Sequence, residues 1–199
     1  MAKSDFLRYA VILAVICVAA AGLLSAVYGV TQPKIAAQRL AEEEESLKDV
    51  YPAAATFEPV TKDDTILYYR ALDDKRALLG YAFKAVRRGY SSDIVTMAGM
   101  TPEGRIVRIE VLSQNETPGL GTRVTEVIQK ETLWDVLLRR VKVLVQPRPW
   151  FQERFDGKDA ATLGQTVDAI TGATISSSTV IASVKEKALE VLRQVNDGR

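Results

Sequence analysis

The stretch that decides the fold of the C-terminal half is Asp168-Ala169-Ile170-Thr171-Gly172-Ala173-Thr174, followed by Ile175-Ser176-Ser177-Ser178-Thr179. Beyond it, apolar residues recur at helical spacing as far as Asn196, at Val180, Ile181, Val184, Ala188, Val191 and Leu192. The pattern predicts a turn rich in Thr, Gly and Ser that leads into a long amphipathic terminal helix. Two readings of the hydroxyl groups stay open. Either they cap the helix and form its turn, or they join the unsatisfied first-turn amides in binding a phosphate.

Length and charge limit the classes to which the chain can belong. Its 199 residues are enough for one domain of ordinary size and exclude a multi-domain enzyme. Lys and Arg total 26 against 25 Asp and Glu, so there is no basic field of the kind that holds a nucleic-acid backbone. We therefore expect no nucleic acid among the partners.

Histidine is absent, and Cys17 is the one cysteine. The lack of histidine excludes Ser-His-Asp and Cys-His nucleophiles, His-containing metal sites and the commonest general base at neutral pH. A single thiol excludes an intrachain disulfide and a zinc ribbon or iron–sulfur cluster held by this chain alone. We expect no metal site and no catalytic acid or base, so any chemistry depends on a group that is not one of the chain's own side chains.

A long apolar run near the N-terminus predicts an uncleaved membrane anchor. Tyr9–Val30 is a run of 22 residues without a charge. A helix of that length spans a bilayer core of about 30 Å. A cleaved signal peptide is the alternative, but its apolar region is usually about 7–15 residues long. Ile16 stands where a lipoprotein signal at Cys17 needs a small residue. Basic residues flank both ends of the run, so charge gives it almost no orientation.

The part between the anchor and the terminal helix is expected to hold a stalk and a sheet. Residues 31–52 predict a helical stalk, in which a separate short polar helix over Lys34–Val50 follows Pro33. Glu42–Glu45 would be a solvated face of that helix, and Pro52 would end it. Aromatic and β-branched residues then predict a meander of about four strands, at Thr65–Leu72, Leu78–Val86, Asp93–Met100 and Arg105–Leu112. Asp73–Lys75 and Thr101–Gly104 are predicted turns between them. The fold class is α+β: one transmembrane helix, then a domain with an antiparallel sheet and packed helices.

A second segment rich in Gly and Pro runs from Gln114 to Thr122. Gly119 and Gly121 flank one leucine and predict a tight loop whose backbone can approach a ligand closely. Residues 123–145 are expected to be helical or mixed, with Trp134, Leu137 and Leu138 among their apolar side chains. Gly157-Lys158 is not a phosphate-binding P-loop, because Asp159 follows where that motif needs Ser or Thr. A surface turn is the interpretation there.

Two ordered motifs carry a resemblance to a known family. Asp168-x-x-Thr171-Gly172-Ala173-Thr174 is similar to the Asp-x-x-(Ser/Thr)-Gly-Ala-Thr motif of proteins modified by a dedicated flavin transferase. Glu116-Thr117-Pro118-Gly119-Leu120-Gly121 matches the other signature of their FMN-binding domain. With one transmembrane helix before that domain, the chain resembles the G subunits of Rnf complexes. These complexes are membrane ion pumps that couple electron transfer between ferredoxin and NAD.

The resemblance implies FMN esterified through its phosphate to Thr174, in an FMN-binding domain over residues 53–199. Asp168 then belongs to the sequence that the transferase recognises. The implied cofactor-binding residues are Thr174, Thr171, Gly172, Ala173, Ser176, Glu116, Thr117, Gly119, Leu120 and Gly121. The flavin supplies the electron chemistry and the protein positions it, so no stand-alone catalysis is expected.

The function implied by the resemblance is electron transfer within a ferredoxin:NAD oxidoreductase complex of the cytoplasmic membrane. Residues 1–8 would be cytoplasmic, residues 9–30 the anchor, and the soluble domain would face outside. The implied partners are other Rnf membrane subunits, the flavin transferase and, in some lineages, a cytochrome. An insertion-like stretch near 123–154 is either a docking surface or a helix packed on the core. Two other functions stay open: the C subunit of a sodium-pumping quinone reductase, or an anchored assembly or sensor domain that binds FMN without moving electrons.

Overall fold

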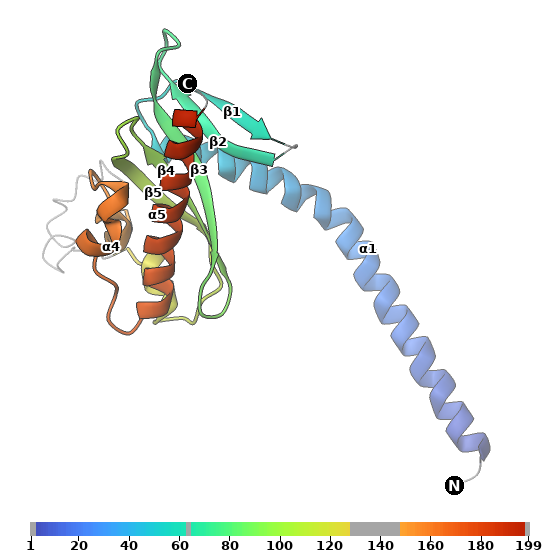
Figure 1. Ribbon diagram of the computed structural model, residues 1–199. Helices are drawn as coiled ribbons and strands as arrows, with labels where there is room; N and C mark the ends of the chain where they lie inside the picture. The colour runs from blue at the N-terminus through green and yellow to red at the C-terminus, as the bar shows by residue number, and fades with distance from the viewer. Residues whose placement is uncertain (1–2, 63–64, 128–147, 198–199) are drawn as a thin grey trace, which may run out of the picture. The chain divides into compact units, whose positions relative to one another are not determined.

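The computed structural model describes residues 3–62, 65–127 and 148–197 (Figure 1). The chain divides into two compact units, Met1–Glu43 and Glu44–Arg199. The first unit is helical throughout its described length. The second contains the end of the same helix, the sheet and the remaining helices.

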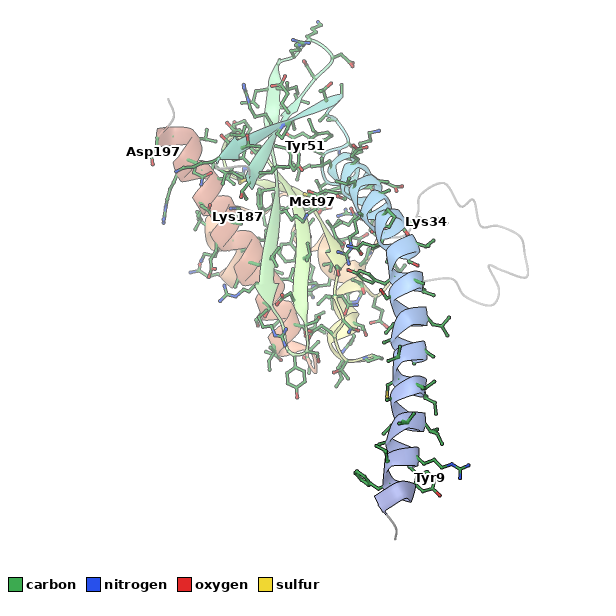
Figure 2. The ribbon with its side chains drawn as sticks, turned by 90° about the vertical axis from the view of Figure 1, so that its right-hand side faces the viewer. Tyr9, Lys34, Tyr51, Met97, Lys187 and Asp197 are labelled. Atoms are coloured by element: carbon green, nitrogen blue, oxygen red, sulfur yellow. The ribbon has the colours of Figure 1, made fainter. Side chains whose placement is uncertain are left out.

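One helix, α1 (Lys3–Val50), runs through the segments expected as anchor and stalk. The predicted start of a new helix after Pro33 is not seen. Proline lacks the N–H that would bond back to Gly29, but α1 continues through it (Figure 2). The apolar part of α1, from Phe6, is long and apolar enough to cross a membrane, and its large side chains are exposed. The prediction of an N-terminal apolar helix is therefore confirmed.

The sheet is an antiparallel meander of five strands in the order β1-β2-β3-β4-β5. Its strands are β1 (Thr56–Lys62), β2 (Thr65–Leu72), β3 (Leu78–Arg88), β4 (Asp93–Met100) and β5 (Ile106–Ser113). Four of these strands agree with the predicted ones. The sheet has one strand more than the four or so that the sequence predicts. The strand that sequence analysis missed is β1, which contains Pro59 and lies at the edge of the sheet. Proline is tolerated at an edge because the missing N–H faces no partner strand.

The two predicted turns close as expected. The Asp73 side chain accepts hydrogen bonds from the amides of Lys75 and Ala77, at 2.8 and 2.7 Å. At the other turn the Gly104 amide donates to the Thr101 carbonyl at 3.0 Å, and Gly104 has a φ of 88°. A left-handed conformation at that position favours glycine.

Helices cover both faces of the sheet. The terminal helix α5 (Thr174–Asp197) packs on β3 and β4 (Figure 1). Its apolar face joins Phe83, Ala98 and Ile109 in the main core. Neighbouring residues of a strand point to opposite faces, so Ala82 and Met97 face the other way. They pack with Leu47 and Val50 from the end of α1. The acidic run before these two residues is mostly exposed, which agrees with a solvated face.

Short elements beside β5 and α5 complete the domain. They are η1 (Gly121–Thr125), α3 (Trp150–Glu153), η2 (Ala160–Thr162) and α4 (Leu163–Thr166). Phe151 and Phe155 are fully buried, with ring centroids 5.5 Å apart. Gly157-Lys158 forms a turn whose backbone bonds to Ile106 of β5, in agreement with the interpretation as a surface turn. Most of the stretch expected to be helical or mixed, including Trp134, Leu137 and Leu138, lies outside the described residues.

The end of α1 packs against two glycines. Tyr51, directly after the helix, is buried, and its hydroxyl donates to the Leu79 carbonyl at 2.7 Å. A Cβ on Gly80 would lie 2.8 Å from the Tyr51 ring, and a Cβ on Gly99 would collide with the Val50 carbonyl oxygen. The close approach of α1 therefore requires glycine at position 99, whereas at position 80 the backbone of β4 and the Tyr51 ring together leave no room for a side chain.

We expect Gly99→Ala to lower the stability of the full-length chain in detergent by about 1–3 kcal/mol, because the added methyl overpacks this contact. Thermal unfolding followed by circular dichroism should show Tm falling by at least about 3 °C. Gly164→Ala is the matched control, since a Cβ there meets nothing within 4 Å, and its Tm should stay level or rise slightly. Equal Tm values for the two variants would contradict the packing.

Candidate functional site

One pocket joins the two motif segments singled out in the sequence. Its volume is about 460 Å³, and it lies where the loop after β5, the tip of the β3–β4 hairpin and the start of α5 meet. The lining residues are Tyr90, Glu116, Thr117, Leu120, Gly121, Gly172, Ala173, Thr174, Ile175 and Ser176. Segments more than fifty residues apart in the sequence therefore form one concave surface.

A tight turn sets the start of α5. The Ala173 amide donates to the Ile170 carbonyl at 2.9 Å, and Gly172 has a φ of 83°, which favours glycine there. Ser177 ties the turn to the helix, since its hydroxyl accepts from the Ile170 amide and donates to the Ala173 carbonyl. The helix begins at Thr174, so the serines lie inside its first turns and do not precede it as caps. Thr174 itself is exposed at the pocket.

Glu116 lies at the centre of the site. Its side chain is buried, with 4% of its surface exposed. One carboxylate oxygen accepts from the Ser91 and Ser92 amides, both at 3.0 Å. The other accepts from the Tyr90 amide at 3.1 Å and from the Ser176 hydroxyl at 2.5 Å. The carboxylate therefore binds the hairpin tip to the first turn of α5.

These hydrogen bonds keep Glu116 ionised. Burial by itself raises the pKa of the carboxyl. The bonds from the Ser176 hydroxyl and from three amides of the hairpin tip outweigh it and lower the pKa from 4.5 to about 2. A buried charge is stable when its acceptor sites are occupied by donors of this kind.

Two glycines make room for this carboxylate. A Cβ on Gly89 would lie 2.7 Å from a carboxylate oxygen of Glu116. A Cβ on Gly121 would lie 2.6 Å from both the Glu116 Cβ and the Ser176 hydroxyl oxygen. Close approach of a ligand is the reason for glycine that the sequence of this loop predicts. The contact with Glu116 and Ser176 is a further reason for glycine at position 121.

Three of the residues implied by the resemblance do not line the pocket. Gly119 is exposed and has a φ of 76°, and its amide donates to the Thr122 hydroxyl. The Thr171 carbonyl accepts from the Arg123 guanidinium at 2.9 Å. Asp168 is exposed and lines a different hollow, of about 510 Å³.

Sequence reasoning missed three residues of the site. Tyr90 and Ile175 line the pocket, and Arg123 places a positive charge beside the turn that precedes α5. The signal for Ile175 was its place directly after Thr174. Nothing in the sequence links Tyr90 to either motif, because the link is the contact between the hairpin tip and Glu116.

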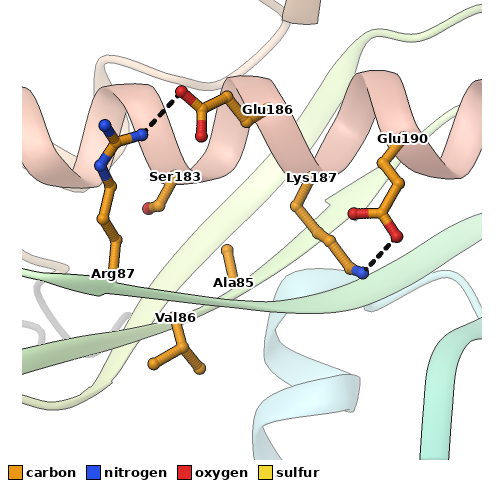
Figure 3. Close-up of a pocket in the computed structure, with 7 residues that line it drawn as sticks. All are labelled: Ala85, Val86, Arg87, Ser183, Glu186, Lys187 and Glu190. Carbon is orange, nitrogen blue, oxygen red and sulfur yellow. Dashed lines mark hydrogen bonds and ion pairs between the residues drawn. The ribbon is translucent and has the colours of Figure 1, made fainter.

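A further hollow of about 290 Å³ lies between β3 and α5 (Figure 3). Arg87 pairs with Glu186 at 2.6 Å, and Lys187 pairs with Glu190 at 2.9 Å. All the charged residues that line this hollow belong to these two ion pairs, and no motif residue takes part. It is part of the packing of α5 on the sheet.

Known families and relatives match most of the chain. The FMN-binding domain family matches residues 89–189, and the N-terminal region of the RnfG family matches residues 1–50. The G subunit of the ion-translocating oxidoreductase complex of Methanosarcina acetivorans is 30% identical, over 90% of each chain. The G subunit of the proton-translocating ferredoxin:NAD(+) oxidoreductase complex of Clostridium ljungdahlii is 26% identical, over 90% of this chain and 88% of that one. Among solved structures, NqrC of Shewanella oneidensis is 16% identical with a TM-score of 0.44, over 73% of this chain and 74% of that one.

Glu116→Gln should destabilise the protein at pH 7 and much less in acid. The folded-state pKa is depressed, so the carboxylate contributes stability above the unfolded value of 4.5 and loses it as pH falls towards about 2. The contribution at pH 7 is about 3–4 kcal/mol, since a pKa of about 2 lies about 2.5 below 4.5 and one pKa unit is about 1.4 kcal/mol. Urea unfolding of the full chain in detergent, at pH 7 and at acid pH, measures the difference in the free energy of unfolding between wild type and variant.

The control for this experiment is Glu126→Gln, an exposed carboxylate in the same loop region, 3.5 Å from Arg123. Its effect should stay below about 1 kcal/mol at both pH values, as for other exposed ion pairs. A Glu116→Gln gap that is the same at both pH values would refute the assignment of an ionised carboxylate.

Proposed function

Since the chain belongs to the family of RnfG-type G subunits of ion-translocating oxidoreductase complexes, and contains an FMN-binding domain, we propose that it carries FMN covalently on Thr174. In this role it passes electrons between other members of a membrane complex. The observation that supports the proposal most directly is the pocket that joins the two motif segments at the start of α5.

The chemistry of the pocket fits FMN. The first-turn amides of α5 have no acceptor within the helix and lie at its positive end, where a phosphate binds well. Thr117 and Thr174 add exposed hydroxyls, and the Arg123 guanidinium adds positive charge beside the turn. Leu120 and Ile175 supply apolar surface for a ring system. A volume of about 460 Å³ lies within the range of small-molecule sites, about 300–1,000 Å³.

Thr174 is the hydroxyl best placed for the ester. The Ser176 hydroxyl is buried and donates to Glu116, and the Ser177 hydroxyl is buried and bonded within the turn. Thr174 is exposed and is the first residue of the helix, beside its free amides. The net change on attachment is the addition of FMN and the loss of one water, with a new bond between phosphorus and the threonine oxygen.

Asp168 has a role in attachment and not in holding the flavin. It is exposed and lines the hollow of about 510 Å³ together with Ser178 and Lys185. Its backbone carbonyl accepts from the Arg154 guanidinium at 3.3 Å, which fixes the chain there. A carboxylate in this position is accessible to a flavin transferase, in line with the recognition role that the resemblance implies.

The residues of the pocket position the flavin and do not transform a substrate. When bound, FMN supplies the electron chemistry. Glu116 is the only carboxylate among the described residues that line the pocket, and donors already occupy both of its oxygens. It is therefore not available as a general acid or base.

The proposal includes the placement of the chain in the membrane. The apolar part of α1 anchors it, with residues 1–8 on the cytoplasmic side and the FMN-binding domain outside. An ester bond suits that location, because it prevents loss of the cofactor where the cell cannot replace it. The other subunits of the complex and a flavin transferase are the partners. A cytochrome contact through residues 123–154 would fall mostly outside the described residues.

Thr174→Ala should abolish flavin attachment. We would co-express the full chain with a flavin transferase, then measure ultraviolet fluorescence after denaturing electrophoresis and the intact mass. Wild type should be fluorescent and heavier by FMN less one water, and Thr174→Ala should be dark and unmodified. Thr174→Ser, which keeps a hydroxyl, should retain modification at least in part.

Thr61→Ala is the matched control, because it removes an exposed threonine hydroxyl on β1, outside both the pocket and the hollow that Asp168 lines. Its mass should show full modification. An unmodified wild type, alongside a control protein that the same transferase does modify, would overturn the covalent linkage.

A further inference from the structure

Exposed apolar side chains gather at the pocket. In the described part of residues 44–197, the large apolar side chains exposed to solvent are Ile66, Val86, Tyr90, Leu120, Val127 and Ile175. Three of these, Tyr90, Leu120 and Ile175, line the pocket and are 68%, 51% and 55% exposed. Single exposed apolar side chains are ordinary, but convergence of three segments on one concave surface is typical of a binding site.

The backbone that carries Tyr90 is fixed although its side chain is exposed. The Tyr90 amide donates to Glu116, and the Gly89 amide donates to the Ser92 carbonyl at 2.7 Å, which closes the hairpin tip. The tip lies so close to Glu116 that residue 89 has no room for a Cβ. An aromatic side chain held in this way loses little entropy when a ligand covers it, since only two side-chain torsions remain to be ordered.

An ester on Thr174 would fix the phosphate and leave the ring system free to turn about several single bonds. Electron transfer to a partner needs a ring in a defined position, and contacts with the ring itself must supply it. Ile175 follows the attachment residue directly, and Leu120 and Tyr90 lie on the other walls of the same pocket. Tyrosine is the aromatic member of this set, and flat ring pairs gain from offset stacking beyond their buried area.

We propose that Tyr90 is a positioning residue for the flavin, with its phenol ring against the isoalloxazine ring and with Leu120 and Ile175 completing the apolar surface. This inference rests on the proposed attachment of FMN at Thr174. The β3–β4 hairpin tip, which contains neither motif, then controls the position of the flavin ring and the access of solvent to it. Glu116 acts on the ring indirectly, because it holds this tip in place.

The experiment uses full-length protein in detergent, flavinylated by co-expression with the transferase, and compares wild type with Tyr90→Phe and Tyr90→Ala. A phenol in contact with an excited flavin quenches its fluorescence by a reversible electron transfer, so both variants should be several-fold brighter than wild type. Iodide quenching measures solvent access to the ring. It should be unchanged in Tyr90→Phe, which keeps the aromatic surface, and increased several-fold in Tyr90→Ala. The flavin midpoint potential should shift further in Tyr90→Ala than in Tyr90→Phe.

Val86→Ala is the control, because Val86 is also exposed on the same hairpin but points away from α5 and does not line this pocket (Figure 3). It should match wild type in brightness and iodide quenching. Intact mass is measured for each sample. If every sample carries FMN and Tyr90→Ala matches wild type in both optical readouts, the role of Tyr90 is refuted while the proposed function stands. If wild type carries no FMN under conditions that modify a control protein, the proposed function and this inference fall together.

Discussion

The site depends on an ionised carboxylate buried where three segments of chain meet. Glu116 accepts hydrogen bonds from the tip of the β3–β4 hairpin and from the first turn of α5, and it stands at the start of the loop that it helps to hold. Removing a carboxylate from water is costly, and only a full set of donors offsets that cost. If either the hairpin tip or the start of α5 moved away, the buried carboxylate would lose hydrogen bonds and would be destabilised. Such a contact favours one geometry of the pocket over the alternatives.

A second constraint operates at the opposite end of the same two strands. Tyr51 and the end of α1 pack on Gly80 and Gly99, whereas the pocket lies beyond Gly89, at the far end of β3. Gly89 lies nine positions after Gly80, which at about 3.3 Å per residue is roughly 30 Å of strand. The end of α1 and the pocket thus lie at opposite ends of the β3–β4 hairpin and share no residue. The helix α5 packs along the same two strands.

Much of this fold could be predicted because it depends on local patterns. The bounds of β2 and β4, the turns at Asp73 and Gly104, and the terminal helix all follow from spacing and turn chemistry. The strand β1 escaped notice because Pro59 and charged neighbours lower its β propensity, and pairing at an edge overrides that preference. The continuity of α1 through Pro33 was also missed, since sequence rules place a probable helix end before proline. The position of Tyr90 at the pocket had no local signal, because the hydrogen bond that fixes its backbone joins residues 26 positions apart.

The run Thr174-Ile175-Ser176-Ser177-Ser178 shows how helix geometry separates residues that look alike in sequence. At 3.6 residues per turn, positions 174 and 178 fall on one side and are exposed, whereas positions 176 and 177 turn inward and are buried. The two buried hydroxyls are hydrogen-bonded within the protein, one to Glu116 and the other to the backbone of the turn before the helix. Of the two exposed hydroxyls, only Thr174 lies among first-turn amides at the positive end of the helix. The buried serines thus stabilise the start of the helix, while the hydroxyl of Thr174 stays exposed. The difference between these similar hydroxyl residues follows from the position at which the helix begins.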